Sequence, residues 1–467
     1  MSSAPARIGI IVVAYNAAST LAKVLDRIPK EFIPRIDEIL ICDNASEDQT
    51  YLVGLGYKEV DGRSLPLNVI RNPRNLGYGG NQKVGYQWAI EHDLDIVVLL
   101  HADGQYAPEF LPQIVDALEA EGCDAVFGSR MMTKGGARKG GMPLYKFVGN
   151  KILTQFENRV VGTQLSEWHS GYRAYRVSTL REIPFHRNSD EYHFDTDIII
   201  QLHEAGKRIV ELPIPTYYGE EISYVNGTRY AKDIFIDVLR YRAHKMGIGS
   251  GDLAFASDAA DGTGRPDTAS GRMSAWLSGR APSCVLALGG AGAALGTELR
   301  ARGHDVVVVT DDSDDGTDGA IVADLDDGIP EAAGSGFDVV VLLDGLGRVR
   351  DPAALLKDVR AVLAPGGVAL ASIPNFGHWY ARSKVLTGRW GYDRRGILDE
   401  RNLRFFSRRD VEALFDANGY DIARFETVGL PLEPGRNTAL AVADGIGLAV
   451  RPSLFAYQLV YELVPSA

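Results

Sequence analysis

The chain of 467 residues is poor in cysteine and in long apolar runs, and its net charge is negative. Its three cysteines, Cys42, Cys123 and Cys284, form no Cys-x-x-Cys pair, which argues against a disulfide scaffold or thiolate zinc site and favours a reducing compartment. A net charge of −12 argues against general nucleic-acid binding. The longest apolar run, residues 439–450, contains Asp444 and is shorter than the roughly 20 residues that cross a bilayer. With no signal-peptide pattern, we expect a cytoplasmic protein that meets any lipid substrate at the inner face of the membrane.

The composition divides the chain into three regions, as its length leads one to expect. Residues 1–247 and residues 283–467 alternate β-rich runs with helical patterns, which is typical of α/β folds. Residues 248–282 are rich in Gly, Ser, Ala and Asp and predict a flexible linker. We therefore expect two different α/β domains joined by a linker.

The clearest functional signal is an apolar run that ends in polar side chains. Residues 96–100 predict a buried strand, and His101, Asp103 and Gln105 follow it. Alternate residues beyond a strand end point the same way, so these side chains can converge. Imidazole, carboxylate and amide oxygen together suit a divalent ion that also holds phosphate oxygens. A turn at Asp103-Gly104 that only reverses the chain explains these residues, taken alone, equally well.

Three earlier predicted strands, at residues 8–13, 38–42 and 67–70, also end in polar or Gly-rich segments. In an open α/β sheet, ligands bind beyond the carboxyl ends of the strands. Asp43 can accept from a base or a ribose hydroxyl, and Tyr15 offers a ring to a nucleoside. The glycines after the third strand allow close approach of backbone to a ligand. Any one of these segments is an ordinary turn, but their recurrence favours a nucleotide site.

These strand-end motifs resemble those of family 2 glycosyltransferases with the GT-A fold, in particular the branch of dolichol-phosphate mannose synthase and other polyprenyl-phosphate glycosyltransferases. The resemblance extends over residues 8–245. Its motifs are Val13-Ala14-Tyr15-Asn16, Asp43-Asn44-Ala45-Ser46-Glu47-Asp48-Gln49-Thr50, Asn75-Leu76-Gly77-Tyr78-Gly79-Gly80-Asn81, His101-Ala102-Asp103-Gly104-Gln105-Tyr106, Gly128-Ser129-Arg130, Ser170-Gly171-Tyr172-Arg173 and Glu211-Leu212-Pro213-Ile214-Pro215.

The resemblance implies a metal-dependent, inverting transfer from a nucleoside-diphosphate sugar to a polyprenyl phosphate or a cell-surface glycan. Asp103 and Gln105 match metal-binding positions of the family, whereas His101 stands where the family carries its first acid. Imidazole suits Mg²⁺ poorly, so we expect a preference for Mn²⁺ or fewer protein ligands. The donor-binding residues that the resemblance implies are Tyr15, Asn16, Asp43, Ser46, Asp48, Asn75, Gly79, Gly80 and Asn81.

Two arginines and two further side chains are candidates for the acceptor side. Arg130 and Arg173 suit an acceptor phosphate, because a guanidinium fork matches phosphate oxygens, although each also suits a structural ion pair. Glu167 or His169 would serve as general base for a hydroxyl acceptor, whereas a phosphate acceptor is already anionic and needs no strong base. Together with Asp103, the residues Glu167, His169 and Arg173 are our catalytic candidates.

The second predicted domain resembles class I S-adenosylmethionine-dependent methyltransferases of the methionine-biosynthesis type, with a Rossmann-like fold. A strand, a Gly-rich turn and a helix open it, and residues 374–379 and 402–407 support the resemblance. Ala287 and Ala291 stand where relatives carry an acid and a glycine, and a Cβ at Ala291 crowds the cofactor loop. We therefore expect an impaired cofactor site. Candidate cofactor-binding residues are Gly289, Gly290, Gly292, Asp311, Asp324 and Asp344.

Three functions remain open from the sequence. The favoured one is a glycosyltransferase with an impaired methyltransferase-like domain. A bifunctional enzyme that also methylates a glycan is the second, and a non-catalytic nucleotide-sugar scaffold is the third. Retention of Asp43, Asp103 and Arg173 argues against the scaffold. The expected partners are a nucleoside-diphosphate sugar, a lipid-phosphate or glycan acceptor and the surface of a membrane, but no nucleic acid.

Overall fold

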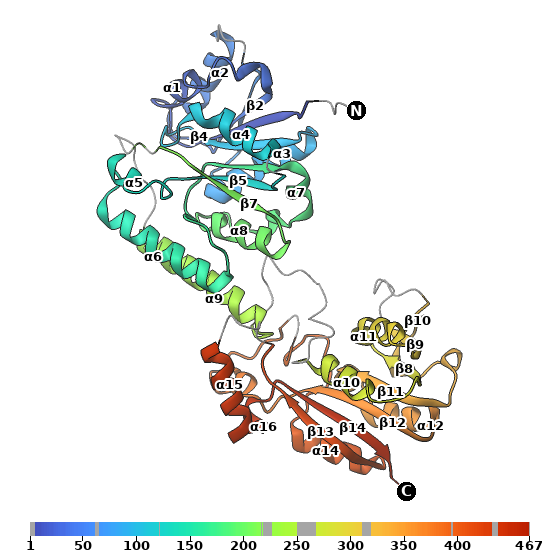
Figure 1. The fold of residues 1–467 in the computed structure, drawn as a ribbon. Coiled ribbons are helices and arrows are strands. Elements are labelled where there is room, and N and C mark those ends of the chain that lie inside the picture. Colours follow the sequence, from blue (N-terminus) through green and yellow to red (C-terminus); the bar gives the residue numbers. More distant parts are fainter. Residues whose placement is uncertain are drawn as a thin grey trace. The chain divides into compact units, whose positions relative to one another are not determined.

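The computed structural model describes residues 5–60, 65–120, 122–215, 217, 227–249, 268–310, 319–393, 396–431 and 438–466. The chain forms two compact units, Met1–Arg242 and Ala243–Ala467 (Figure 1). No helix among the described residues is both long enough and apolar enough to span a bilayer.

The first unit is built on a seven-stranded mixed sheet with the order β3-β2-β1-β4-β6-β5-β7. β1 to β4 are parallel, and they are the four strands that the sequence predicts. β6 runs antiparallel between β4 and β5. The strands are β1 (Ile8–Ala14), β2 (Ile36–Asp43), β3 (Leu67–Arg71), β4 (Ile96–His101), β5 (Ala125–Ser129), β6 (Arg173–Arg176) and β7 (Ile209–Pro213).

Helices lie on both faces of this sheet. The predicted helix after the Gly-rich segment is α3, and short 3-10 turns lie at 33–35, 108–110 and 185–187. The helices are α1 (Leu21–Asp26), α2 (Thr50–Val60), α3 (Gly77–Glu91), α4 (Leu111–Ala120), α5 (Gly136–Lys139), α6 (Leu144–Val161), α7 (Val177–Glu182), α8 (Phe194–Glu204) and α9 (Gly227–Lys245).

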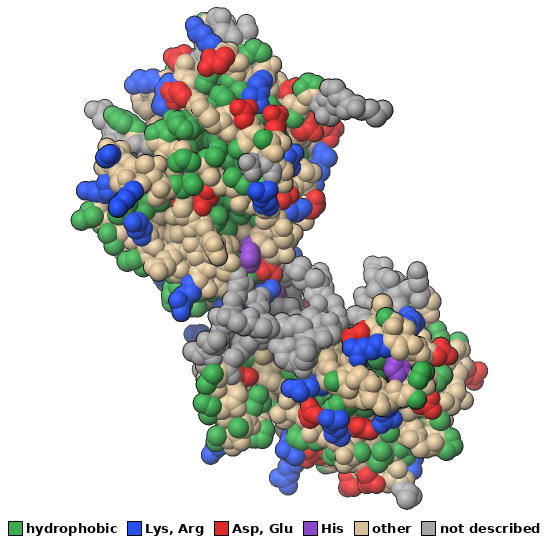
Figure 2. Space-filling view, in the orientation of Figure 1, with side chains coloured by type: hydrophobic (Ala, Val, Ile, Leu, Met, Phe, Trp, Pro, Cys, Tyr) green, Lys and Arg blue, Asp and Glu red, His purple; other side chains and the backbone are tan. Residues whose placement is uncertain are grey.

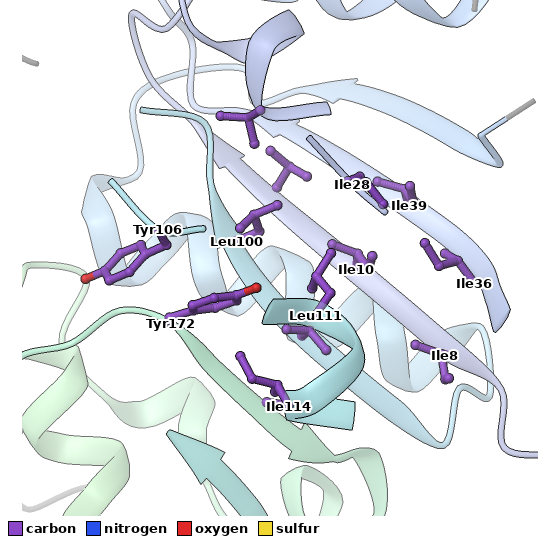
Figure 3. Packing of buried hydrophobic residues seen from close by; sticks show 14 of the residues in the cluster. Ile8, Ile10, Ile28, Ile36, Ile39, Leu100, Tyr106, Leu111, Ile114 and Tyr172 are labelled. Carbon is purple, nitrogen blue, oxygen red and sulfur yellow. The ribbon is translucent and has the colours of Figure 1, made fainter. Parts of the chain in front are cut away.

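The two central strands, β1 and β4, are apolar up to the end of β1 and up to Leu100 of β4, because both of their faces are covered. Ile10 and Leu100 are completely buried and pack with Leu111 of α4 (Figure 3). Burial of each such side chain is worth about 1.5–3 kcal/mol. Tyr106 and Tyr172 belong to the same cluster, and their ring centroids are 5.6 Å apart. The core therefore fixes the strand ends at which the polar motifs begin.

The second unit contains another seven-stranded sheet, with the order β10-β9-β8-β11-β12-β14-β13. β14 is antiparallel to both of its neighbours, and the other pairs are parallel. This confirms the expected Rossmann-like α/β fold. The strands are β8 (Cys284–Leu288), β9 (Asp305–Thr310), β10 (Ile321–Val322), β11 (Phe337–Leu343), β12 (Leu363–Pro374), β13 (Tyr420–Val428) and β14 (Gln458–Pro465). The helices are α10 (Ala269–Leu277), α11 (Gly290–Ala301), α12 (Pro352–Val362), α13 (Trp379–Leu386), α14 (Arg408–Ala417), α15 (Thr438–Val450) and α16 (Pro452–Phe455), with 3-10 turns at 325–327, 331–333 and 345–347.

The boundary between the units differs from the division predicted at residue 247. The first unit ends at Arg242, and Ile248 is buried in a cluster of the second unit. Of the predicted linker, residues 250–267 lie outside the described residues. α10 lies inside the predicted linker, yet Met273 and Leu277 are completely buried against the second sheet. This part of the segment is therefore a packed helix rather than a linker.

Candidate active site

A cavity of about 1590 Å³ lies in the first unit, beyond the carboxyl ends of β1 and β4. Such a position is where open α/β sheets bind ligands. The predicted site residues that line it are Tyr15, Asn16, Asn75, Asn81, His101, Asp103, Gln105, Arg130 and His169. The structure also describes Asp43, Ser46, Asp48, Gly79, Gly80, Glu167 and Arg173, but these do not belong to the lining.

The polar residues Asp43 and Ser46, at and just after the end of β2, lie beside the loop that carries the cavity residues Tyr15 and Asn16. Asp43 is completely buried, and its Oδ2 lies 3.4 Å from Nε of Arg71. Ser46 accepts, through Oγ, a hydrogen bond of 2.9 Å from the backbone N–H of Asn16. Ser46 therefore positions the loop after β1, Asp43 is held by Arg71, and the predicted contact of both residues with a donor stays a prediction.

Asp48 supports the same loop from its other side. Its carboxylate accepts hydrogen bonds from the backbone N–H of Ala18, at 3.1 Å, and from Thr50, at 2.9 Å. Burial raises the pKa of Asp48, but the hydrogen bonds from Thr50 and Ala18 outweigh it and hold the pKa below its usual value. Asp48 is therefore ionised at neutral pH and anchors the loop as a carboxylate.

The glycines at the start of α3 pack against protein backbone. The N–H groups of Gly79 and Gly80 donate to the carbonyl oxygen of Asp190, at 2.7 and 3.2 Å. A Cβ at Gly79 would lie 2.3 Å from the carbonyl oxygen of Ser189. The close approach that glycine allows is thus used for helix packing. We no longer place Gly79 and Gly80 against the donor.

Two asparagines of the same motif hold neighbouring segments together. Asn75 accepts, through Oδ1, hydrogen bonds from the side chain of Asn44 and from the backbone N–H of Gly77, at 2.9 and 2.8 Å. Asn81 is buried, donates to the carbonyl of Cys42 at 3.1 Å and accepts from Asn72 at 2.9 Å. Both residues still border the cavity, so they join the strand ends to its wall.

Asp197 of α8 lies close to the contact between Gly79 and Ser189. Its burial predicts that the stability of the protein depends on pH. Burial raises the pKa of Asp197 to about 7, against a smaller lowering by the N–H of Ser189. Between about pH 4 and pH 7 the folded state therefore holds a proton that the unfolded state has lost, so the free energy of unfolding falls as pH rises. Urea unfolding at about pH 5 and about pH 7.5 is expected to show this fall in the wild type and a smaller one in Asp197→Asn. Equal falls would contradict the assignment.

At the end of β4, His101 and Asp103 have different environments. The ring of His101 lies between Tyr78 and Tyr106, with centroids 5.8 and 5.1 Å away. A Cβ at Gly171 would lie 2.6 Å from Nε2 of His101, so this edge of the imidazole packs against the Gly171 backbone. Burial lowers the pKa of His101, although Asp103 opposes the shift. His101 is thus neutral, and its buried Nε2 has no hydrogen-bond partner among the described residues.

Asp103 and Gln105 face the cavity. Oδ1 of Asp103 accepts the backbone N–H of Gln105 at 3.0 Å, which closes the turn predicted from Asp103-Gly104. Within the described part of the chain, no group of three or more His, Cys, Asp or Glu side chains is placed to hold a metal ion.

Arg130 and Glu167 form a buried ion pair at the wall of the cavity. Nε of Arg130 donates to Oε1 of Glu167 at 2.8 Å, and the backbone N–H of Arg130 donates to Oε2 at 2.7 Å. Asn150 donates to Oε1 at 2.8 Å. Burial raises the pKa of Glu167, but Arg130 outweighs it and holds the pKa below its usual value. With both oxygens engaged, Glu167 is unsuited to be a general base.

Arg173 is completely buried and does not reach the cavity. Its guanidinium donates to the carbonyl oxygens of Ser170, Trp168 and Asp195, at 2.8, 2.7 and 3.1 Å. It also lies over the ring of Phe127, with its central carbon 4.7 Å from the centroid. These contacts give Arg173 a structural role, and we no longer place it on an acceptor phosphate.

His169 lines the cavity between two residues that lie outside the sequence motifs. Its Nδ1 lies 2.9 Å from the hydroxyl of Tyr230, and its Nε2 lies 3.1 Å from Oε2 of the buried Glu157. Glu157 belongs to an inward-facing stripe of α6 that also contains Asn150 and Thr154. Polar residues at helical spacing on a buried face are the signal that could have revealed Glu157.

The predicted cofactor residues of the second unit that the structure describes lie in turns and at the start of α11. Gly289 has a φ of 89° in the turn after β8, which favours glycine, and Gly290 and Gly292 lie in the first turn of α11. Asp324 caps its own turn by accepting the N–H of Asp326 at 2.9 Å. Asp311 lies outside the described residues.

Asp344, the remaining candidate, is engaged by protein. Its Oδ1 accepts the hydroxyl of Ser372 at 2.6 Å, and its Oδ2 accepts the amide of Gln458 at 2.9 Å. Burial raises the pKa of Asp344, against the hydrogen bond from Ser372. The carboxylate of Asp344 is therefore already engaged by Ser372 and Gln458.

Known protein families match the sequence of each of the two units. Residues 9–184 match the family model described as glycosyl transferase family 2, and residues 264–424 match a methyltransferase domain model. Undecaprenyl-phosphate mannosyltransferase of Micrococcus luteus is 31% identical over 217 residues, which are 46% of this chain and 85% of the relative. The chain belongs to glycosyl transferase family 2. The resemblances inferred from its motifs are thereby confirmed.

Other relatives of this family 2 glycosyltransferase match the same half of the chain. Polyprenol monophosphomannose synthase of Mycolicibacterium smegmatis is 27% identical and is covered over 83% of its length by 48% of this chain. UDP-N-acetylglucosamine–dolichyl-phosphate N-acetylglucosaminyltransferase of Methanococcus voltae is 29% identical, with coverage of 88% by 47% of this chain. Glucosyl-3-phosphoglycerate synthase of Mycobacterium tuberculosis, solved with Mn²⁺, uridine diphosphate and phosphoglyceric acid, is 17% identical with a TM-score of 0.41, over 53% of this chain and 81% of that one.

Proposed function

We propose that this family 2 glycosyltransferase transfers a sugar from a nucleoside-diphosphate sugar to a polyprenyl phosphate at a membrane surface. The names of three relatives contain undecaprenyl phosphate, polyprenol monophosphomannose and dolichyl phosphate, respectively. The observation that carries the choice of acceptor is the state of the two candidate bases. Glu167 is saturated by Arg130 and Asn150, and Nδ1 of His169 is engaged by the hydroxyl of Tyr230 while its buried Nε2 lies 3.1 Å from the Glu157 carboxylate. A phosphate acceptor, unlike a hydroxyl, needs no base.

The cavity supplies groups suited to both substrates. Tyr15 and Asn16, on the loop after β1, line the cavity and would contact a nucleoside, and Lys23 and Lys146 bring positive charge to its wall. An acceptor phosphate oxygen attacks the anomeric carbon as the bond from that carbon to the nucleoside diphosphate breaks. Cationic side chains around the cavity favour both the anionic acceptor and the departing diphosphate.

Asp103 is the residue that we propose to hold a divalent cation, together with diphosphate oxygens. A bound Mg²⁺ or Mn²⁺ neutralises charge on the leaving diphosphate. The Asp103 carboxylate and diphosphate oxygens suit Mg²⁺ as well as Mn²⁺. The preference for Mn²⁺ expected from the imidazole of His101 stays a prediction.

A paired acceptor assay tests the proposed function. The full chain is incubated with labelled GDP-mannose, UDP-glucose or UDP-N-acetylglucosamine and either undecaprenyl phosphate or the corresponding alcohol. We expect a labelled lipid with the phosphate and none with the alcohol. Transfer to the alcohol alone, or to neither acceptor with any donor, would contradict the proposal.

For the second unit, we infer that the methyltransferase-like fold no longer binds S-adenosylmethionine. The engaged carboxylate of Asp344 and the alanines at 287 and 291 support this inference. Calorimetric titration of the full chain with S-adenosylmethionine is expected to give no binding heat. Saturable binding would favour the bifunctional alternative.

A further inference from the structure

Helix α6 buries polar side chains and exposes apolar ones, which is the reverse of an ordinary surface helix. Its polar residues Asn150, Thr154 and Glu157 face inward and are at most 8% exposed. Its apolar residues Leu144 and Val148 face outward, as does the later Ile152. A surface helix of a soluble protein normally buries its apolar stripe. The outward stripe of α6 is therefore not explained by packing within the unit.

This outward surface, which we call the α6 face, consists of Leu144, Tyr145, Val148 and Ile152. These side chains are 62%, 73%, 44% and 61% exposed. Leu144, Val148 and Ile152 are spaced by four residues, so they form one continuous stripe along the helix. Contiguous exposed apolar surface of this kind marks an interaction site.

The surroundings of the α6 face are basic although the whole chain carries a net charge of −12. Residues 131–161 contain six Lys or Arg side chains and one acid, Glu157, which is completely buried. Figure 2 shows hydrophobic and basic side chains together along the edge of the first unit that α5 and α6 form. The basic residues are Lys134, Arg138, Lys139, Lys146, Lys151 and Arg159.

We propose that the α6 face docks on the headgroup layer of an anionic lipid bilayer, a proposal that rests on the proposed function. Apolar side chains enter the boundary between headgroups and acyl chains, while Lys and Arg pair with lipid phosphates. A second copy of this chain fits less well, since its own α6 face would bring the same positive charge. Tyr145 and Ile152 also line the cavity, so the docked face places the cavity beside the lipid surface from which a prenyl phosphate projects.

Vesicle flotation of the full chain tests this proposal. Leu144 and Val148 lie outside the cavity lining, so Leu144→Ser/Val148→Ser removes part of the apolar stripe without touching the active site. We expect wild type to float with vesicles of phosphatidylglycerol and phosphatidylcholine, and the double variant to partition about tenfold less. The charge variant Lys139→Glu/Lys151→Glu should lose about as much, and binding of the wild type should weaken at high salt.

The matched control is Leu52→Ser/Val60→Ser on α2, because Leu52 and Val60 are 59% and 81% exposed but lie outside the α6 face. It should float like the wild type, and all variants should keep the wild-type melting temperature. Failure of the wild type to float, or equal flotation of the α6 and α2 variants, would overturn the proposal. So would a dimer in solution that Leu144→Ser/Val148→Ser splits while vesicle binding is unchanged.

Transfer assays separate this proposal from the proposed function. With a short-chain, water-soluble polyprenyl phosphate, Leu144→Ser/Val148→Ser should keep wild-type activity, whereas its activity on vesicle-embedded acceptor should fall about tenfold. If the wild type glycosylates neither acceptor but still floats through the α6 face, the proposed function fails and the docking surface stands. If it glycosylates the soluble acceptor without floating, the function stands and the docking surface fails.

Discussion

Replacing Asp103 with asparagine is expected to lower kcat/KM for sugar transfer by about 10³-fold, equivalent to about 4 kcal/mol of transition-state stabilisation. Asp103 faces the cavity from the end of β4, and its Oδ1 already closes a turn with the N–H of Gln105. Asparagine keeps that hydrogen bond, so the turn should survive. The variant loses only the negative charge, which is what a divalent cation and its diphosphate ligand require.

Calorimetry with a nucleoside-diphosphate sugar separates a lost metal contact from a general defect. Added Mg²⁺ should strengthen donor binding by the wild type and leave binding by Asp103→Asn unchanged. Asp116→Asn is the control, since Asp116 is exposed on α4 in an ion pair with Arg35. That variant should keep activity within about twofold of the wild type. Full activity of Asp103→Asn would remove Asp103 from the site.

The parallel half of the first sheet could be predicted from the sequence because its strands are buried on both faces. Such strands appear as continuous apolar runs, as residues 96–100 do, and the polar motif after each run marks its carboxyl end. β6 is different, since it is four residues long and contains two arginines. Its antiparallel place between β4 and β5 depends on long-range pairing, which no local pattern encodes.

The same distinction applies to the site. Motif positions correctly placed Tyr15, Asn16 and Asp103 around one cavity, because they follow adjacent strands. The sequence could not show which group each side chain contacts. Gly79 meets backbone at residues 189–190, more than 100 positions away, so a glycine that suggests a ligand instead permits helix packing. Glu167 has the residue type of a general base, but only the fold shows that its carboxylate is paired with Arg130.

Arg173→Lys is expected to destabilise the first unit by about 3–5 kcal/mol, because the planar fork of arginine cannot be reproduced by a single ammonium. The guanidinium reaches three carbonyl oxygens, of Trp168, Ser170 and Asp195, which are fixed in different directions. Lysine keeps the charge opposite the Asp195 carboxylate, now 3.4 Å from Nη1, but leaves buried carbonyls without donors. For a unit of this size, the melting temperature should fall by roughly 10 °C.

Arg181→Lys provides the matched control, since Arg181 is half exposed in an ion pair with Asp93. Its melting temperature should stay within about 2 °C of the wild type, because exposed pairs contribute little. The two roles considered for Arg173 then separate cleanly. If Arg173 is structural, Arg173→Lys should lower the melting temperature. Sugar transfer and donor hydrolysis should then fall by the same factor, which is the factor by which the amount of folded protein falls. An acceptor clamp predicts an unchanged melting temperature and a raised KM for the lipid phosphate alone, and that result would return Arg173 to the acceptor site.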